Sequence, residues 1–89
     1  MNELPTHTQV LESVQHFCSE AVGLSPVEVL EDYDLRDDLG MSPVELGEVL
    51  SRLQEKYKFV LPKEHLKEIV TDLSTVSSLV EYVEEELEL

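Results

Sequence analysis

The stretch 38–46 reads DLGMSPVEL and contains the clearest helix start in the chain. Ser42 has a hydroxyl suited to a helix N-cap, Pro43 suits the first helical position, and Glu45 completes a capping box. The sequence therefore predicts a long helix over 43–57. Its predicted inner face consists of Val44, Leu46 or Gly47, Leu50, Leu53 and Tyr57.

Outward from this stretch, apolar residues spaced three and four apart predict two more long helices, over 8–22 and 76–87. A short helix is predicted near 63–69, and a second Ser-Pro-Val-Glu, at 25–28, predicts a short helical turn. An acidic loop over 31–41 joins that turn to the helix after Ser-Pro. No segment shows a convincing strand pattern, so the predicted fold class is all-α, a small three-to-four-helix bundle without a sheet.

Composition and charge exclude several classes of protein. The chain has 89 residues, 42% of them hydrophobic, which predicts one core and a single domain over 1–89. Twenty Asp and Glu against six Lys and Arg give a net charge of −14, which excludes nucleic acid and anionic membrane surfaces as partners. No stretch approaches the roughly 18 consecutive apolar residues of a membrane span, and the first residues carry no basic run. We therefore expect a soluble, cytoplasmic monomer.

Catalytic and metal-binding patterns are missing from the sequence. The single cysteine, Cys18, lies on an apolar helix stripe, so we expect a buried, inert side chain that closes no disulfide. A calcium-type loop begins at Asp32, but Arg36, Asp37 and Pro43 stand where an oxygen ligand, a turn glycine and a bidentate glutamate are needed. Three glycines are too few for a phosphate cradle or a nucleophile elbow. We therefore expect neither an enzyme nor a metal site.

Four motifs follow one another in an unusual order: AVGL at 21–24, DLG at 38–40, LP at 61–62 and TVSSLVEYV at 75–83. In this order and at these separations they resemble the acyl carrier protein family, and the resemblance covers most of the chain. It implies a non-catalytic carrier that holds 4′-phosphopantetheine on a serine and presents an acyl or aminoacyl thioester, as in fatty acid or polyketide biosynthesis. The implied partners are a phosphopantetheinyl transferase and acyl-handling enzymes with basic patches.

The chain departs from the family at the modified serine. In the family, Asp-Leu-Gly is followed by one residue and then by Asp-Ser-Leu, whose serine carries the arm. The corresponding residues here are Ser42, Pro43 and Val44, so proline occupies the position of the serine. Shifting the alignment by one residue would place Ser42 at the position of the family's modified serine. It would also place Arg52 and Lys56 in the core. Ser42 is therefore a candidate attachment residue that lies one position early.

Two interpretations of Ser42 stay open at this point. Either its hydroxyl accepts the arm, or it only caps the helix, as Ser-Pro-Val-Glu at 25–28 would without a cofactor. The alternative to a carrier is an adaptor or regulatory module that keeps the carrier fold but lacks the prosthetic group. In both cases we expect an acidic surface to steer basic partners, although the same residues also suit an ordinary solvated helix face. This surface consists of Asp37, Asp38, Glu45, Glu48 and Glu55.

Overall fold

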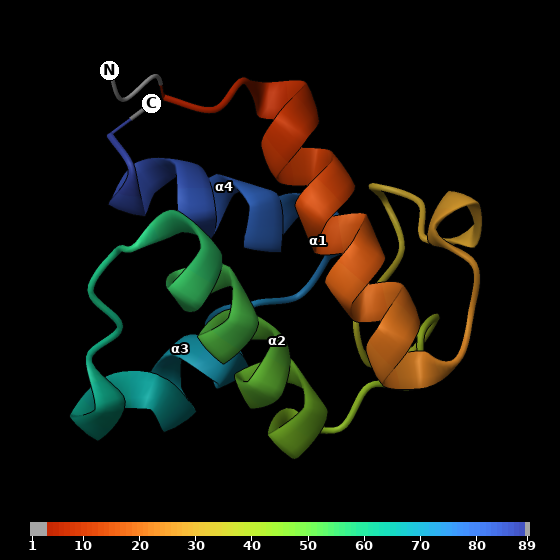
Figure 1. The fold of residues 1–89 in the computed structure, drawn as a ribbon. Coiled ribbons are helices and arrows are strands. Elements are labelled where there is room, and N and C mark those ends of the chain that lie inside the picture. Colours follow the sequence, from red (N-terminus) through yellow and green to blue (C-terminus); the bar gives the residue numbers. More distant parts are fainter. Residues whose placement is uncertain (1–3, 89) are drawn as a thin grey trace.

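The structure is a computed structural model that describes residues 4–88, and its regular elements are helices (Figure 1). Within these residues no strand forms, and Asp34 and Thr75 make one isolated antiparallel bridge. The all-α fold predicted from the sequence is confirmed. In chain order the elements are α1 (His7–Val22), the 3-10 helix η1 (Pro26–Glu28), α2 (Pro43–Tyr57), the 3-10 helix η2 (Lys63–His65), α3 (Leu66–Asp72) and α4 (Val76–Glu86).

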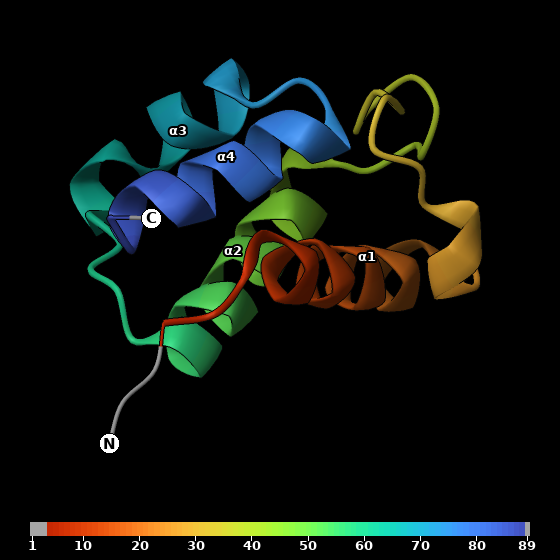
Figure 2. The ribbon, with the colours of Figure 1, turned by 90° about the horizontal axis from the view of Figure 1, so that it is seen from above.

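The first helix organises the bundle, because α1 packs against both α2 and α4, while α3 packs against α2. Seen from above, the long connection from η1 to α2 lies at one end of the bundle (Figure 2). Within the described part of the chain, the helices are too short or too polar to cross a membrane.

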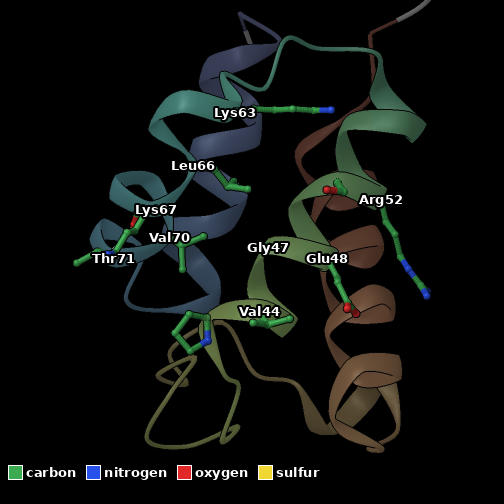
Figure 3. Close-up of a pocket in the computed structure, with 11 residues that line it drawn as sticks. Val44, Gly47, Glu48, Arg52, Lys63, Leu66, Lys67, Val70 and Thr71 are labelled. Atoms are coloured by element: carbon green, nitrogen blue, oxygen red, sulfur yellow. The ribbon is translucent and has the colours of Figure 1, made fainter.

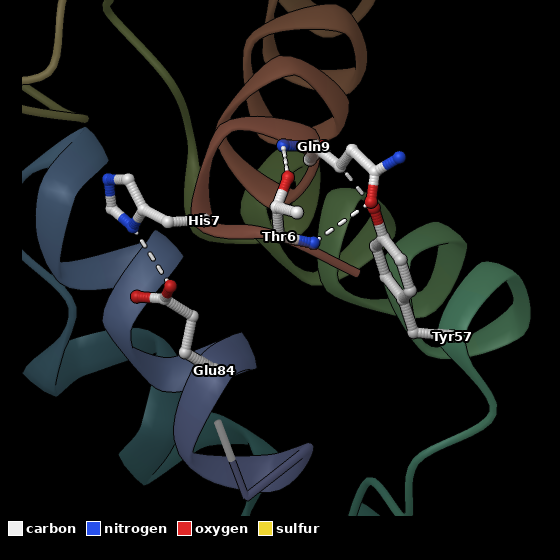
Figure 4. A network of polar contacts seen from close by, with 5 residues as sticks. All are labelled: Thr6, His7, Gln9, Tyr57 and Glu84. Atoms are coloured by element: carbon white, nitrogen blue, oxygen red, sulfur yellow. Dashed lines mark hydrogen bonds and ion pairs between the residues drawn. The ribbon is translucent and has the colours of Figure 1, made fainter. Parts of the chain in front are cut away.

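The predicted helix bounds agree closely with the structure. The helix over 43–57 is confirmed at both ends. α1 begins one residue earlier than predicted because Thr6 caps it, its Oγ1 accepting a hydrogen bond from the N–H of Gln9 at 3.2 Å (Figure 4). α4 ends one residue earlier than predicted, at Glu86. The short helix near 63–69 is η2 followed by α3, and it continues three residues further.

One apolar cluster fills the space between the helices and the inner side of the connection to α2. The prediction for the inner face of α2 is wrong at Val44, which is 72% exposed, whereas Val49 is buried and was missed. Residues 44 and 46 lie about 200° apart around a helix, so both cannot face one core. The buried side chains of α2 are Leu46, Val49, Leu50 and Leu53.

Cys18 is fully buried in this cluster, as predicted. Burial in apolar surroundings disfavours the thiolate and raises the pKa of the thiol to about 12. Because the thiolate is the reactive form, this cysteine is inert at neutral pH.

Candidate attachment site and the adjoining groove

Ser42 is exposed at the start of α2 and caps this helix, as predicted. Its Oγ accepts a hydrogen bond from the N–H of Glu45 at 3.2 Å, and Glu45 Oε1 accepts one from the N–H of Ser42 at 2.8 Å. Pro43 fills the first helical position, where its missing N–H leaves no unsatisfied donor. A hydroxyl oxygen has two lone pairs, so the cap leaves one lone pair and the proton available.

The loop that leads to Ser42 is ordered by its own acidic side chains. Asp34 Oδ1 accepts hydrogen bonds from the N–H groups of Arg36 at 2.9 Å and Asp37 at 2.8 Å, and Asp38 Oδ2 accepts one from the N–H of Asp34 at 2.7 Å. The N–H of Asp37, followed by that of Arg36, lowers the pKa of Asp34 and favours its charged form. In the part of the chain that the structure describes, no three metal-ligating side chains come together. The hydrogen bonds of Asp34 and Asp38 make the calcium-like stretch a self-capped turn.

The guanidinium of Arg36 ties this loop to the end of α3. Its Nη2 donates to the carbonyl oxygens of Val70 at 2.7 Å and Thr71 at 3.3 Å, and its Nη1 donates to that of Leu73 at 3.3 Å. Carbonyl groups at a helix C-terminus lack partners within the helix and form the negative end of its dipole, so a cation there is favourable. Arg36 therefore fixes α3 relative to the loop that precedes Ser42.

A groove of about 810 Å³ lies between α2 and α3 (Figure 3), and its lining includes Pro43, the residue that follows Ser42 in the sequence. Its apolar walls are Val44 on α2 and Leu66 and Val70 on α3. This position explains why Val44 is exposed, because its side chain lines the groove and not the core. The volume lies in the range of roughly 300–1,000 Å³ that is usual for small-molecule sites. The lining residues are Pro43, Val44, Gly47, Glu48, Ser51, Arg52, Lys63, Leu66, Lys67, Val70 and Thr71.

The predicted acidic residues differ in how far they are available to a partner. Asp37 and Asp38 are exposed on the loop, and Glu48 and Glu55 are exposed on α2. Glu45 is only half-exposed, because its carboxylate is engaged in the capping box of α2.

A further carboxylate joins this surface from another helix. Glu45 and Glu48 line a small hollow together with Glu20 of α1, a residue that the sequence analysis missed. Arg52 lies in the same hollow, and its Nη1 donates to Glu20 Oε1 at 3.2 Å. The acidic surface is therefore interrupted by one paired cation, and only the packing of α1 against α2 brings Glu20 to it.

Comparison with known proteins identifies the family of this chain. The sequence model described as "Phosphopantetheine attachment site" matches residues 12–83, so the chain belongs to this family. An acyl carrier protein of Exiguobacterium sibiricum is 29% identical over 79 residues, which are 89% of this chain and 95% of the relative. One of another Exiguobacterium species is 29% identical over 82 residues, or 92% and 99%. One of Wolinella succinogenes is 27% identical over 75 residues, or 84% and 93%.

The family match identifies 4′-phosphopantetheine as the cofactor of this domain. The start of α2 fits a phosphodiester, because the Ser42 hydroxyl is exposed and a helix N-terminus favours phosphate. Pro43 removes one N–H donor and the Glu45 carboxylate adds negative charge, so this terminus holds phosphate more weakly than one with all its donors. An exposed serine at a helix N-terminus fits the group, and Ser42 is such a residue.

Proposed function

We propose that the chain is an acyl carrier in which Ser42 holds the phosphopantetheine arm. The observation that carries the proposal is the exposed Ser42 at the start of α2, directly before Pro43, which lines the groove between α2 and α3. When bound, the group supplies a terminal thiol that holds an acyl or aminoacyl chain as a thioester. The protein contributes the attachment point and the groove, and the chemistry on the chain belongs to partner enzymes.

Capping and attachment are compatible at Ser42. In loading, Ser42 Oγ loses its proton and bonds to the phosphorus of coenzyme A that carries the pantetheine, while the P–O bond of the pyrophosphate breaks and adenosine 3′,5′-bisphosphate leaves. The lone pair that accepts the N–H of Glu45 stays on the ester oxygen, so the cap survives. A tether at this point raises the effective concentration of the cargo at each partner enzyme.

The partners we propose are a phosphopantetheinyl transferase and acyl-handling enzymes with basic patches, which meet the chain as a monomer. Support comes from the exposed carboxylates of Asp37, Asp38 and Glu48, which flank Ser42 in the sequence and lie on the loop and on α2. Opposite charges of this kind speed encounters and orient the partners.

Intact-mass measurement after incubation with coenzyme A and a phosphopantetheinyl transferase tests the proposal. The wild type should gain the mass of one phosphopantetheine, and Ser42→Ala should gain none. Ser25→Ala, which changes the matching serine of the other Ser-Pro-Val-Glu, is the control and should load like the wild type. Pro43→Ser places a serine at the family position and should load faster.

The alternative is an adaptor or regulatory module that keeps the carrier fold without the arm, and Pro43 at the position of the family's serine favours it. Under this alternative the wild type resists several transferases, whereas Pro43→Ser is modified. That pair of results would reject the carrier proposal.

A further inference from the structure

α3 is more weakly anchored than the other α-helices. It packs against α2, and Val70 is its only buried residue, whereas α1, α2 and α4 have four or five buried residues each. Between Phe59 and Val70, a stretch that the structure describes in full, no residue is buried. A helix of 7 residues does not persist alone in water. Little apolar surface therefore opposes the separation of α3 from α2.

The C-terminal end of α3 is held by one side chain from a distant part of the sequence, that of Arg36. Its guanidinium donates to the carbonyl oxygens of Val70 at 2.7 Å, Thr71 at 3.3 Å and Leu73 at 3.3 Å. Within residues 4–88, no side chain from any other element donates a hydrogen bond to α3. Carbonyl groups at this end have no partners within the helix, so they depend on Arg36 or on water.

Arg36 is fixed in turn by the acidic turn over 34–38. Its N–H donates to Asp34 Oδ1 at 2.9 Å, and its carbonyl oxygen accepts a hydrogen bond from the N–H of Gly40 at 2.9 Å. Gly40 lies two residues before Ser42. Continuous hydrogen bonds therefore connect the end of α3, through Arg36, to the backbone that leads to Ser42.

We propose that α3 opens and closes as a unit and that Arg36 is its latch, so that the position of α3 is coupled to the acidic turn before Ser42. In the closed state the guanidinium binds the α3 carbonyl groups, and in the open state these bonds are broken and the groove loses one wall. Coupling of this kind is reciprocal. A change that loosens the turn favours the open state, and a partner that fixes the turn holds α3 closed.

Hydrogen exchange of the backbone amides at 70–73, at fixed pH and without denaturant, measures the opening of α3. Arg36→Met keeps an aliphatic stem but has no donors, and these amides should exchange about tenfold faster than in the wild type. Arg52→Met removes the other arginine of the chain, which pairs with Glu20 on α1, and is the control with the same change in charge. It should leave exchange at 70–73 unchanged.

A second control separates opening of α3 from unfolding of the whole chain. Thr6 caps α1, and this cap stays in place when only α3 opens. Thr6→Ala should therefore lower the Tm without changing exchange at 70–73. Equal acceleration in Thr6→Ala and Arg36→Met would show that α3 unfolds only with the rest of the chain, which overturns the proposal. Exchange that Arg36→Met leaves unchanged would overturn it too.

The coupling to the turn is tested at Asp34, whose carboxylate accepts hydrogen bonds from N–H groups of the turn. Asp34→Ala should speed exchange at 70–73, and combining it with Arg36→Met should add nothing, because its effect passes through Arg36. If Asp34→Ala has no effect, or if the two accelerations multiply, the coupling is overturned. These measurements use the chain without the arm, so a wild type that no transferase loads would reject the carrier function and leave the latch untouched.

Discussion

Two copies of Ser-Pro-Val-Glu start very different elements in this chain. The copy at 42–45 opens α2, which has 15 residues, whereas the copy at 25–28 opens η1, which has 3. Both copies form a capping box, but the N–H of Ser25 donates to Glu28 Oε1 at 3.4 Å, whereas the N–H of Ser42 donates to Glu45 Oε1 at 2.8 Å. Because the tetrapeptide is the same, the difference comes from the apolar residues that follow it and from the surface on which they pack.

This contrast predicts the stability of two matched variants. Ser42→Ala should lower the free energy of unfolding by about 1 kcal/mol, because the Glu45 N–H loses its partner. Ser25→Ala should cost less, because η1 has only 3 residues and its capping box is looser. Urea unfolding followed by circular dichroism measures both, and equal losses would contradict the assignment of the cap. The Ser42 loss occurs whether or not the arm is attached, so stability cannot replace mass as the test of function.

A single ion pair predicts part of the pH dependence of stability. His7 Nδ1 lies 2.8 Å from Glu84 Oε2 and joins the start of α1 to α4 (Figure 4). The hydrogen bond to Glu84, followed by the charges of Glu84 and Glu31, raises the pKa of His7 above 6.5. A raised folded-state pKa means that the stabilisation is complete below about pH 6.5 and is lost as the pH rises through the folded value.

His7→Gln should therefore lower the Tm at pH 5.5 and change it less at pH 8.5, with Glu84→Gln giving the same pattern. The measurement is the Tm of each variant minus that of the wild type across this range. A difference that does not vary with pH, or that grows toward high pH, would show that the pair does not titrate in this way.

At the scale of elements, α2 presents acidic residues toward the partners we propose. Glu48→Lys should weaken binding to a phosphopantetheinyl transferase several-fold, and wild-type binding should weaken steeply as salt is raised. Glu48 is a better position for charge reversal than Glu45, whose carboxylate also caps the helix. Glu81→Lys, exposed on α4, is the control with the same change in charge and should bind like the wild type. If the affinity for the transferase changes neither with salt nor with Glu48→Lys, the electrostatic mechanism is wrong.

The short helix α3 illustrates where prediction from sequence ends. Its 7 residues are too few for a helix that is stable alone. Burial of Val70 and the hydrogen bonds from Arg36 to its last carbonyl groups hold it in place. The proline before 63–69 predicted that a helix would start there, but its end depends on an arginine far away in the sequence. Because α3 is one wall of the groove, Arg36 also helps to set the shape of the groove.

For the whole molecule, spacing and capping residues were enough to predict the fold, since both act within a few residues of each other. The long helices and the Ser42 cap are confirmed for this reason. The sequence did not predict the groove, the exposed side chain of Val44 or the position of Glu20 close to Glu48. Each of these features depends on how two helices pack against each other. The spacing of apolar residues along the sequence says little about which helices pack together. Whether Ser42 is the attachment residue stays a prediction, because its geometry suits a cap and a tether alike.

The net charge of −14 predicts how the whole molecule responds to salt. The described residues contain few ion pairs, and three of these need a protonated histidine, so most carboxylates repel one another without compensation. The screening length falls from about 30 Å at 0.01 M to about 10 Å at 0.1 M salt, and repulsion favours the expanded chain. The Tm should therefore rise by several degrees between these concentrations, equally in sodium and tetramethylammonium chloride if screening is the cause. A Tm that stays constant or falls would mean that the carboxylates contribute net attraction to the folded state.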